Sequence, residues 1–94
     1  MSELIDQAVK ELNQKTGGSF DGAAKFVVTG EGTIMLDDAG AREADEEADV
    51  TLTADPDTFR EIFEGDLDPT SAFMSGRLKI DGDMGQAMKL AQTL

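Results

Sequence analysis

The chain has 94 residues, 20 acidic against 8 basic side chains, a net charge of -12, and no Cys, His, Trp or Tyr. A chain this short rarely buries two separate cores, so we expect a single domain over residues 1–94. The negative charge argues against nucleic acid as a partner, and the missing His and Cys remove the commonest general base, the best nucleophile and any disulfide. Any chemistry would have to rest on carboxylates, Ser, Thr or Lys, and no cofactor is predicted.

The first predicted element is a helix over residues 2–15, where Ile5, Ala8 and Leu12 recur at helical spacing before two glycines. Charged residues are scattered among the first twelve positions, which excludes a secretory signal and a membrane-spanning helix in that stretch. Together with the lack of Cys, this favours a cytoplasmic protein without stable membrane insertion.

Three strands are predicted next. Residues 23–29 and 33–36 are rich in β-forming side chains and are joined by a glycine turn, which predicts a hairpin. Residues 49–53 alternate apolar side chains with threonine, as a half-buried strand does. The acidic segment between them, residues 37–49, has seven acids against one arginine, and we expect it to be an exposed turn and strand edge.

Two Asp-Pro pairs, at residues 55–56 and 68–69, each supply an N-cap acceptor followed by the residue that best suits the first helical position. Two helices should start there, and we expect the apolar side chains of both to face the core. Residues 77–81 then alternate as a strand, with Leu78 and Ile80 inward. A final helix follows Asp83, and this order of elements predicts an α+β domain whose helices cover an antiparallel-rich sheet.

Residues 81–85, Asp-Gly-Asp-Met-Gly, superficially resemble the start of a calcium-binding loop. They lack the third acidic ligand, the glycine at the sixth position and the distal glutamate of such a loop. Asp83 is better interpreted as the N-cap of the last helix, and no metal site is predicted.

The run from Ala48 to Leu94 resembles the second half of sterol carrier protein 2 domains, and its most specific part is Ala72 to Met84, continued by Met88-Lys89-Leu90. The first half matches only in layout, because Ile34 and Met35 stand where family members often have a tryptophan in the second strand. The resemblance implies a five-stranded sheet covered by helices and a hydrophobic tunnel. It also implies binding and transfer, without chemistry, of a sterol, a fatty acid, an acyl-CoA or an isoprenoid or quinone-like lipid.

Methionine suits the lining of such a tunnel, because its flexible thioether can repack around guests of different shape. Spacing alone favours a plain core role for the methionines, and only the family resemblance favours ligand contact. The predicted lipid-binding residues are the apolar side chains on the inward faces of the strands and helices: Phe26, Val28, Ile34, Leu36, Val50, Leu52, Phe59, Phe63, Phe73, Met74, Ile80, Met84 and Met88.

The ligand is expected to have a neutral headgroup, since acyl-CoA carries several negative charges and this surface offers few cations. Arg77 and Lys79 form the best cationic pair, but strand alternation places them opposite Leu78 and Ile80. A lipid-metabolising enzyme is the partner that we expect for a lipid carrier. The last residues differ from a Ser-Lys-Leu peroxisomal address, which favours a bacterial cytosol.

Two other functions remain open at the level of the sequence. The chain could be an accessory protein-interaction module with a packed core and an acidic docking face over residues 37–49. Hydrolysis is a distant third, because Ser71 and Ser75 have no histidine to activate them.

Overall fold

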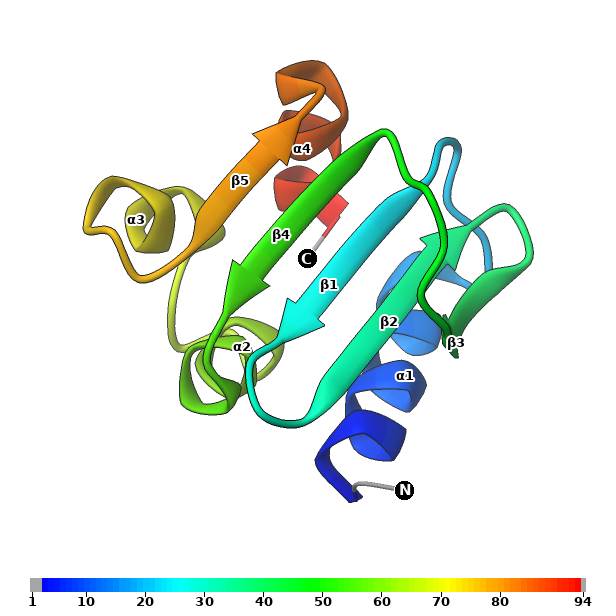
Figure 1. The fold of residues 1–94 in the computed structure, drawn as a ribbon, viewed down its shortest axis with the longest axis horizontal. Helices are drawn as coiled ribbons and strands as arrows, with labels where there is room; N and C mark the ends of the chain where they lie inside the picture. Colours follow the sequence, from blue (N-terminus) through cyan, green and yellow to red (C-terminus); the bar gives the residue numbers. More distant parts are fainter. Residues whose placement is uncertain (1–2, 94) are drawn as a thin grey trace.

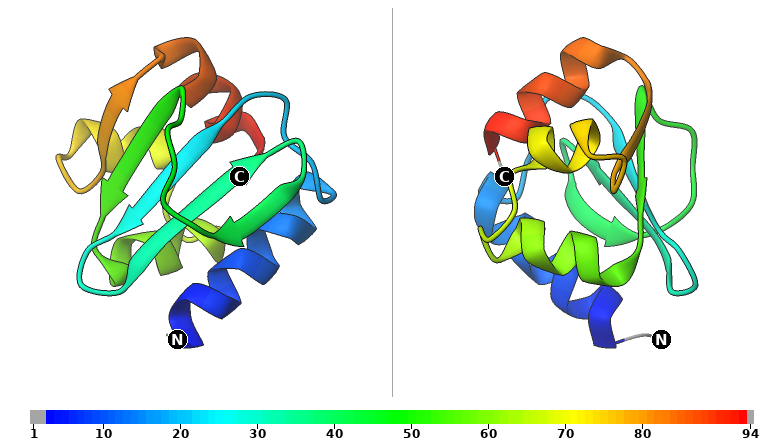
Figure 2. Two further views of the ribbon diagram at one scale, coloured as in Figure 1. Left: turned by 45° about the vertical axis from the view of Figure 1, so that its right-hand side comes forward. Right: turned by 90° about the vertical axis from the view of Figure 1, so that its left-hand side faces the viewer.

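The computed structural model describes residues 3–93, which form one five-stranded sheet with helices on one of its sides (Figures 1 and 2). The elements in chain order are α1 (Glu3–Thr16), β1 (Ala24–Val28), β2 (Gly32–Asp37), β3 (Gly40–Glu43), β4 (Val50–Ala54), α2 (Pro56–Phe63), α3 (Pro69–Met74), β5 (Lys79–Gly82) and α4 (Met84–Thr93). The strand order is β3-β2-β1-β4-β5, and only the central pair β1–β4 is parallel. The predicted α+β class with a five-stranded, antiparallel-rich sheet is confirmed.

Strand β3 is the element that the residue pattern alone did not predict. It lies inside the acidic segment, and its sequence Gly-Ala-Arg-Glu lacks the β-branched and aromatic residues that mark a strand. Its pairing with β2, in which Leu36 lies opposite Ala41, makes it a strand despite this composition. The five-stranded sheet implied by the family resemblance was therefore the better prediction.

The core lies between the helices and the inner face of the sheet. Along β1, buried Ala24, Phe26 and Val28 alternate with half-buried residues, and β4 shows the same pattern. Phe26 meets two rings of α2 edge-on, with centroid distances of 5.8 Å to Phe59 and 6.2 Å to Phe63. The apolar stripe predicted for α1 is buried as expected.

The connection from β3 to β4 crosses the outer face of the sheet, on the side away from the helices (Figure 1). Lys25 Nζ lies 3.0 Å from Asp45 Oδ1, and Arg42 lies 3.2 Å from Glu46 Oε1. Lys25 and Arg42 are the cross-strand neighbours of Met35, which points to this outer face yet is only 1% exposed. The acidic segment is thus a connection anchored by ion pairs over a buried methionine.

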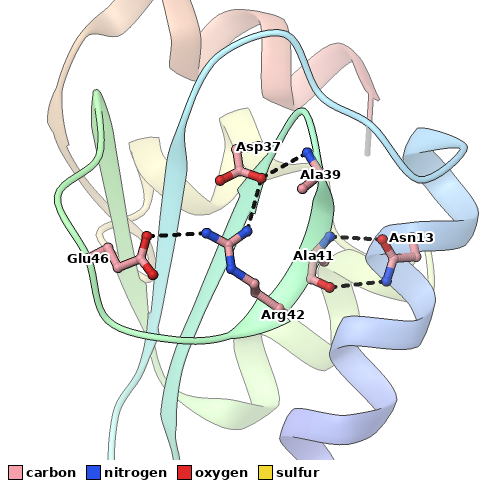
Figure 3. A network of polar contacts seen from close by, with 6 residues as sticks. All are labelled: Asn13, Asp37, Ala39, Ala41, Arg42 and Glu46. Carbon is pink, nitrogen blue, oxygen red and sulfur yellow. Dashed lines mark hydrogen bonds and ion pairs between the residues drawn. The ribbon is translucent and has the colours of Figure 1, made fainter.

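The free edge of β3 is covered by the side chain of Asn13 from α1 (Figure 3). Its amide Nδ2 donates to the carbonyl oxygen of Ala41 at 3.2 Å, and its Oδ1 accepts from the Ala41 N–H at 2.8 Å. Both outward backbone groups of Ala41 are therefore satisfied within the chain, which interrupts the template that this edge strand offers to another chain.

The predicted helix caps differ from one another. Asp55 Oδ1 accepts from the Thr58 N–H at 2.7 Å, and Asp83 Oδ1 accepts from the Gly85 N–H at 2.8 Å, so both act as caps. Asp68 occupies the N-cap position of α3, but its side chain accepts no cap hydrogen bond, contrary to prediction.

No helix within residues 3–93 has the length and hydropathy needed to cross a membrane.

The two Asp-Pro caps provide a matched test of this difference. We expect Asp55→Ala to lower the melting temperature by several degrees, about 4 °C or more, because an N-terminal N–H of α2 loses its acceptor. Asp68→Ala should change the melting temperature by much less, because no side-chain cap bond is lost. Equal effects of the two substitutions in thermal unfolding would contradict this account.

The contribution of the Asp55 cap to stability should also depend on pH. The hydroxyl and the N–H of Thr58 hold the pKa of the Asp55 carboxyl below its ordinary value. A lowered folded-state pKa stabilises the protein above the unfolded-state pKa, and this contribution is lost as the pH falls through the folded-state value. We expect the difference in urea midpoint between the wild type and Asp55→Asn to be present at neutral pH and to shrink in acid. A difference that stays constant down to about pH 2 would exclude the carboxylate as its source.

Candidate functional site

An apolar cavity of about 230 Å³ lies where α3, β5 and α4 meet the end of the sheet. Its walls are Leu52, Pro69, Thr70, Phe73, Met74, Leu78, Ile80, Met84, Ala87, Met88 and Ala91. Thr70 supplies the one hydroxyl in this lining, and no lining residue is charged. The cavity therefore offers contact to hydrocarbon and very little to a charged group.

Three short sequence patterns build these walls. In β5, the strand alternation turns Ile80 toward the helices, opposite Leu52 of β4. In α4, a stripe at helical spacing, Met84, Ala87, Met88 and Ala91, forms the facing wall. The short helix α3 closes one end of the cavity with four of its six residues, Pro69, Thr70, Phe73 and Met74.

Four large hydrophobic side chains around the cavity are exposed: Phe73 at 40%, Met74 at 81%, Met84 at 47% and Met88 at 54%. The expectation that Phe73 and Met74 face the core is wrong. Helix α3 has six residues, so only Pro69 and Ala72, three positions apart, reach the core and are buried. The cavity consequently opens at the surface, and apolar side chains surround the opening.

The structure divides the thirteen predicted lipid-binding residues into two groups. Six of them line the cavity: Leu52, Phe73, Met74, Ile80, Met84 and Met88. The other seven are buried in the core and do not line it: Phe26, Val28, Ile34, Leu36, Val50, Phe59 and Phe63. A ligand-binding role for either group stays a prediction.

Five lining residues were absent from the prediction: Pro69, Thr70, Leu78, Ala87 and Ala91. The two alanines lie on the same stripe of α4 as Met84 and Met88, and Leu78 shares the inward alternation of Ile80. These positions carried a usable signal in their spacing. Thr70 had no such signal, because a threonine after Asp-Pro is typical of the first turn of any helix.

Neither Arg77 nor Lys79, the cationic pair considered for the headgroup, lines the cavity. Lys79 lies beside Thr53 on the other face of the sheet from Ile80. Arg77 is bound to Glu61 of α2, and this contact, with the nearby Asp55 and Asp57, raises the pKa of Arg77. The cavity thus lacks a positive charge in its lining.

Helix α4 is fastened at its side away from the cavity. Lys89 Nζ donates to the carbonyl oxygen of Asp21 at 2.9 Å and lies 5.6 Å from the centre of the Phe20 ring. Leu90, which does not line the cavity, is buried in the core. These contacts hold the helix against the loop before β1 and leave its methionines directed to the cavity and its opening.

The serines considered for hydrolysis lie outside this site. Ser71 is exposed, and the Ser75 hydroxyl donates to the Ala72 carbonyl at 3.1 Å. Among residues 3–93, no three His, Cys, Asp or Glu side chains are grouped so that they could hold a metal ion.

Comparison with known proteins places the chain beside lipid carriers. Residues 4–94 match the model of the SCP-2 sterol transfer family. The chain is 37% identical over 102 residues to hydroxysteroid dehydrogenase-like protein 2 of Xenopus laevis, with 100% of this chain and 24% of that protein covered. The corresponding protein of Danio rerio is 43% identical over 102 residues, with 100% and 25% covered. The chain thus spans about a quarter of these relatives.

Solved structures show the same fold. Sterol carrier protein 2 like 2 of Aedes aegypti has a TM-score of 0.79 at 18% identity, covering 97% of this chain and 96% of that chain. Sterol carrier protein 2 of Aedes aegypti, in complex with the C16 fatty acid palmitate, has a TM-score of 0.79 at 21% identity, covering 98% and 94%. The fold predicted from the family resemblance is confirmed.

The two groups of candidate residues should differ in unfolding experiments. Phe26 is fully buried in the core, so Phe26→Leu should lower the free energy of unfolding by about 1–3 kcal/mol. Phe73 is partly exposed at the cavity opening, so Phe73→Leu should lower it by about 0.5 kcal/mol or less. Urea unfolding measures both, and a larger loss for the Phe73 variant would show that α3 has a structural role that its exposure does not indicate.

Proposed function

Because the chain belongs to the SCP-2 sterol transfer family, we propose that it binds a lipid-like molecule in the cavity between α3, β5 and α4 and transfers or presents it without chemistry. The observation that carries this proposal is the apolar lining of an open cavity with exposed methionines at its opening. A free methionine surface of this kind is costly in water unless a hydrophobic guest or partner covers it.

The size of the cavity favours a slender guest. Its volume of about 230 Å³ is smaller than the roughly 300–1,000 Å³ of most small-molecule sites. Each buried methylene contributes about 0.8 kcal/mol, so part of a single alkyl or isoprenoid chain gives useful affinity. The methionines of α4 can repack to enlarge the space, and a bulkier guest such as a sterol requires this helix to move. The seven core residues of the predicted set become contacts only in that enlarged state.

A neutral headgroup suits the opening best. The lining offers the Thr70 hydroxyl as its polar group, while Arg77 is paired with Glu61 and Lys79 lies on the outer face. The net charge of -12 repels a phosphate-bearing headgroup such as that of acyl-CoA.

The wider setting follows from the relatives. They are about four times longer than this chain and are named as hydroxysteroid dehydrogenase-like proteins, so a lipid-metabolising enzyme is the partner that we propose. A cytoplasmic location is consistent with the lack of Cys. The bacterial origin stays an untested prediction beside vertebrate relatives.

Filling the cavity should abolish binding. Ala91 lines the cavity from α4, so Ala91→Phe places a ring in the space that the lipid needs. We expect it to weaken binding of a fluorescent long-chain alcohol by about tenfold or more. The matched control is Gln92→Phe, one residue further along α4, exposed and outside the lining. If both variants bind as the wild type does, the cavity is not the site; if the wild type binds no lipid, the interaction-module hypothesis is favoured.

Salt should separate the headgroups. Raising ionic strength from about 0.05 M to about 0.5 M screens the repulsion between the acidic surface and acyl-CoA, so affinity for acyl-CoA should rise. Affinity for a neutral alcohol with the same acyl chain length should change little. Calorimetric titration measures both, and an acyl-CoA affinity that falls with salt would reveal a cationic headgroup site.

A further inference from the structure

The free edge of β5 is a self-complementary surface, and we propose that it pairs with β5 of a second copy of this chain to form a two-fold symmetric dimer. The two edge strands of the sheet, β3 and β5, differ in whether their outward backbone groups have hydrogen-bond partners. Asn13 bonds both outward backbone groups of Ala41 in β3, whereas no described residue beyond the sheet ladder bonds the backbone of Ile80 in β5. Exposed edges of this kind are templates for strand addition.

The hydrogen-bond alternation of β5 fixes which groups face outward. The Asp83 N–H donates to the Asp49 carbonyl at 2.9 Å, so Asp83 and Asp49 form a hydrogen-bonded pair of the antiparallel ladder. In such a ladder every second residue bonds the same neighbour. Asp81 and Lys79 therefore bond β4, and the N–H and C=O of Ile80 point to the free edge, where two copies of Ile80 can bond each other reciprocally.

The side chains match the same register. The segment Arg77-Leu78-Lys79-Ile80-Asp81-Gly82-Asp83 is basic before Ile80 and acidic after it. Antiparallel pairing centred on Ile80 puts Lys79 of each copy opposite Asp81 of the other, in a non-hydrogen-bonded position where opposite charges come closest. Within residues 3–93 neither side chain forms an ion pair, and their neighbours in β4 are Thr53 and Thr51. Both charges are thus available.

The exposed apolar side chains of α3 and α4 would also meet in this dimer. A two-fold axis perpendicular to the sheet puts both helical layers on the same side and the start of one β5 beside the end of the other. Helix α3 precedes β5 and α4 follows it, as Figure 1 shows, so exposed Phe73 and Met74 of one copy approach exposed Met84 of the other. Pairing over four residues is short, and this apolar contact adds the buried area that a dimer needs.

Charge also explains why the edge does not pair with arbitrary strands. Charged side chains on an edge normally prevent pairing, since a random partner leaves them without a counter-charge. Here an antiparallel second copy satisfies both charges around Ile80, whereas a parallel copy in the same register places like charges side by side. The edge is thereby restricted to a specific partner.

Charge reversal tests the register. In sedimentation velocity from about 10 μM to about 1 mM protein, the wild type should show a concentration-dependent monomer–dimer equilibrium. Lys79→Glu and Asp81→Lys each place like charges opposite one another twice in the dimer, and each should weaken dimerisation by about tenfold or more. The double variant with both reversals restores the opposite charges and should regain the wild-type dimer affinity. The control is Lys10→Glu, at an exposed position of α1; it makes the same charge change as Lys79→Glu and should dimerise like the wild type.

Melting temperature and circular dichroism establish that each variant is folded, since all three substituted side chains are exposed. A wild type that stays monomeric throughout the range overturns the proposal. So do single reversals that dimerise like the wild type, or a double variant that does not recover.

Discussion

The packing of Phe26 against Phe59 and Phe63 joins the central strand of the sheet to α2, and the rest of the domain depends on this contact. Phe26 lies on β1, which has β2 on one side and β4 on the other. The parallel pairing of β1 with β4 requires a connection that leaves the sheet and returns, and this connection is the acidic segment held by Lys25 and Arg42. A dense centre of this kind lets other parts of the fold remain incompletely filled.

The β5 end of the domain is incompletely filled. There the sheet ends in a four-residue strand, α3 has six residues, and α4 contributes methionines and alanines in place of large branched side chains. Helix α4 is held in place by Lys89 and Leu90, which do not line the cavity. The cavity thus lies at the β5 end of the core, where Leu52, Leu78 and Ala87 belong both to the core and to the cavity wall, and Phe26, Phe59 and Phe63 do not line it.

The sequence predicted the elements well where the pattern was periodic and poorly where an element was short. Alternation located β1, β4 and β5, and helical spacing located α1 and α4. Strand β3 was missed by pattern because its residues have no strand preference, and only pairing with β2 makes it a strand. Phe73 and Met74 were assigned to the core because in a six-residue helix the sequence does not indicate which side chains have room to be buried.

The same limit applies to the site. Phe26 and Phe73 are chemically identical, yet one is a core residue and the other lies at the cavity opening, a difference that depends on the tertiary position of α3. Met74, Met84 and Met88 were assigned to the lining on the family resemblance, because their spacing alone favoured a plain core role. Ala87 and Ala91 were not, because a small side chain contributes to a cavity by the space that it leaves empty.

The covering of β3 by Asn13 limits what kind of assembly this sheet can build. A sheet with two open edges can add copies at both ends and grow into a fibril, whereas a sheet with one satisfied edge can add only one. In the proposed dimer, the two outer edges of the joined sheet are the β3 strands, and at each of them Asn13 occupies the outward backbone groups of Ala41. A single amide side chain on each outer edge thus hinders the addition of a third copy.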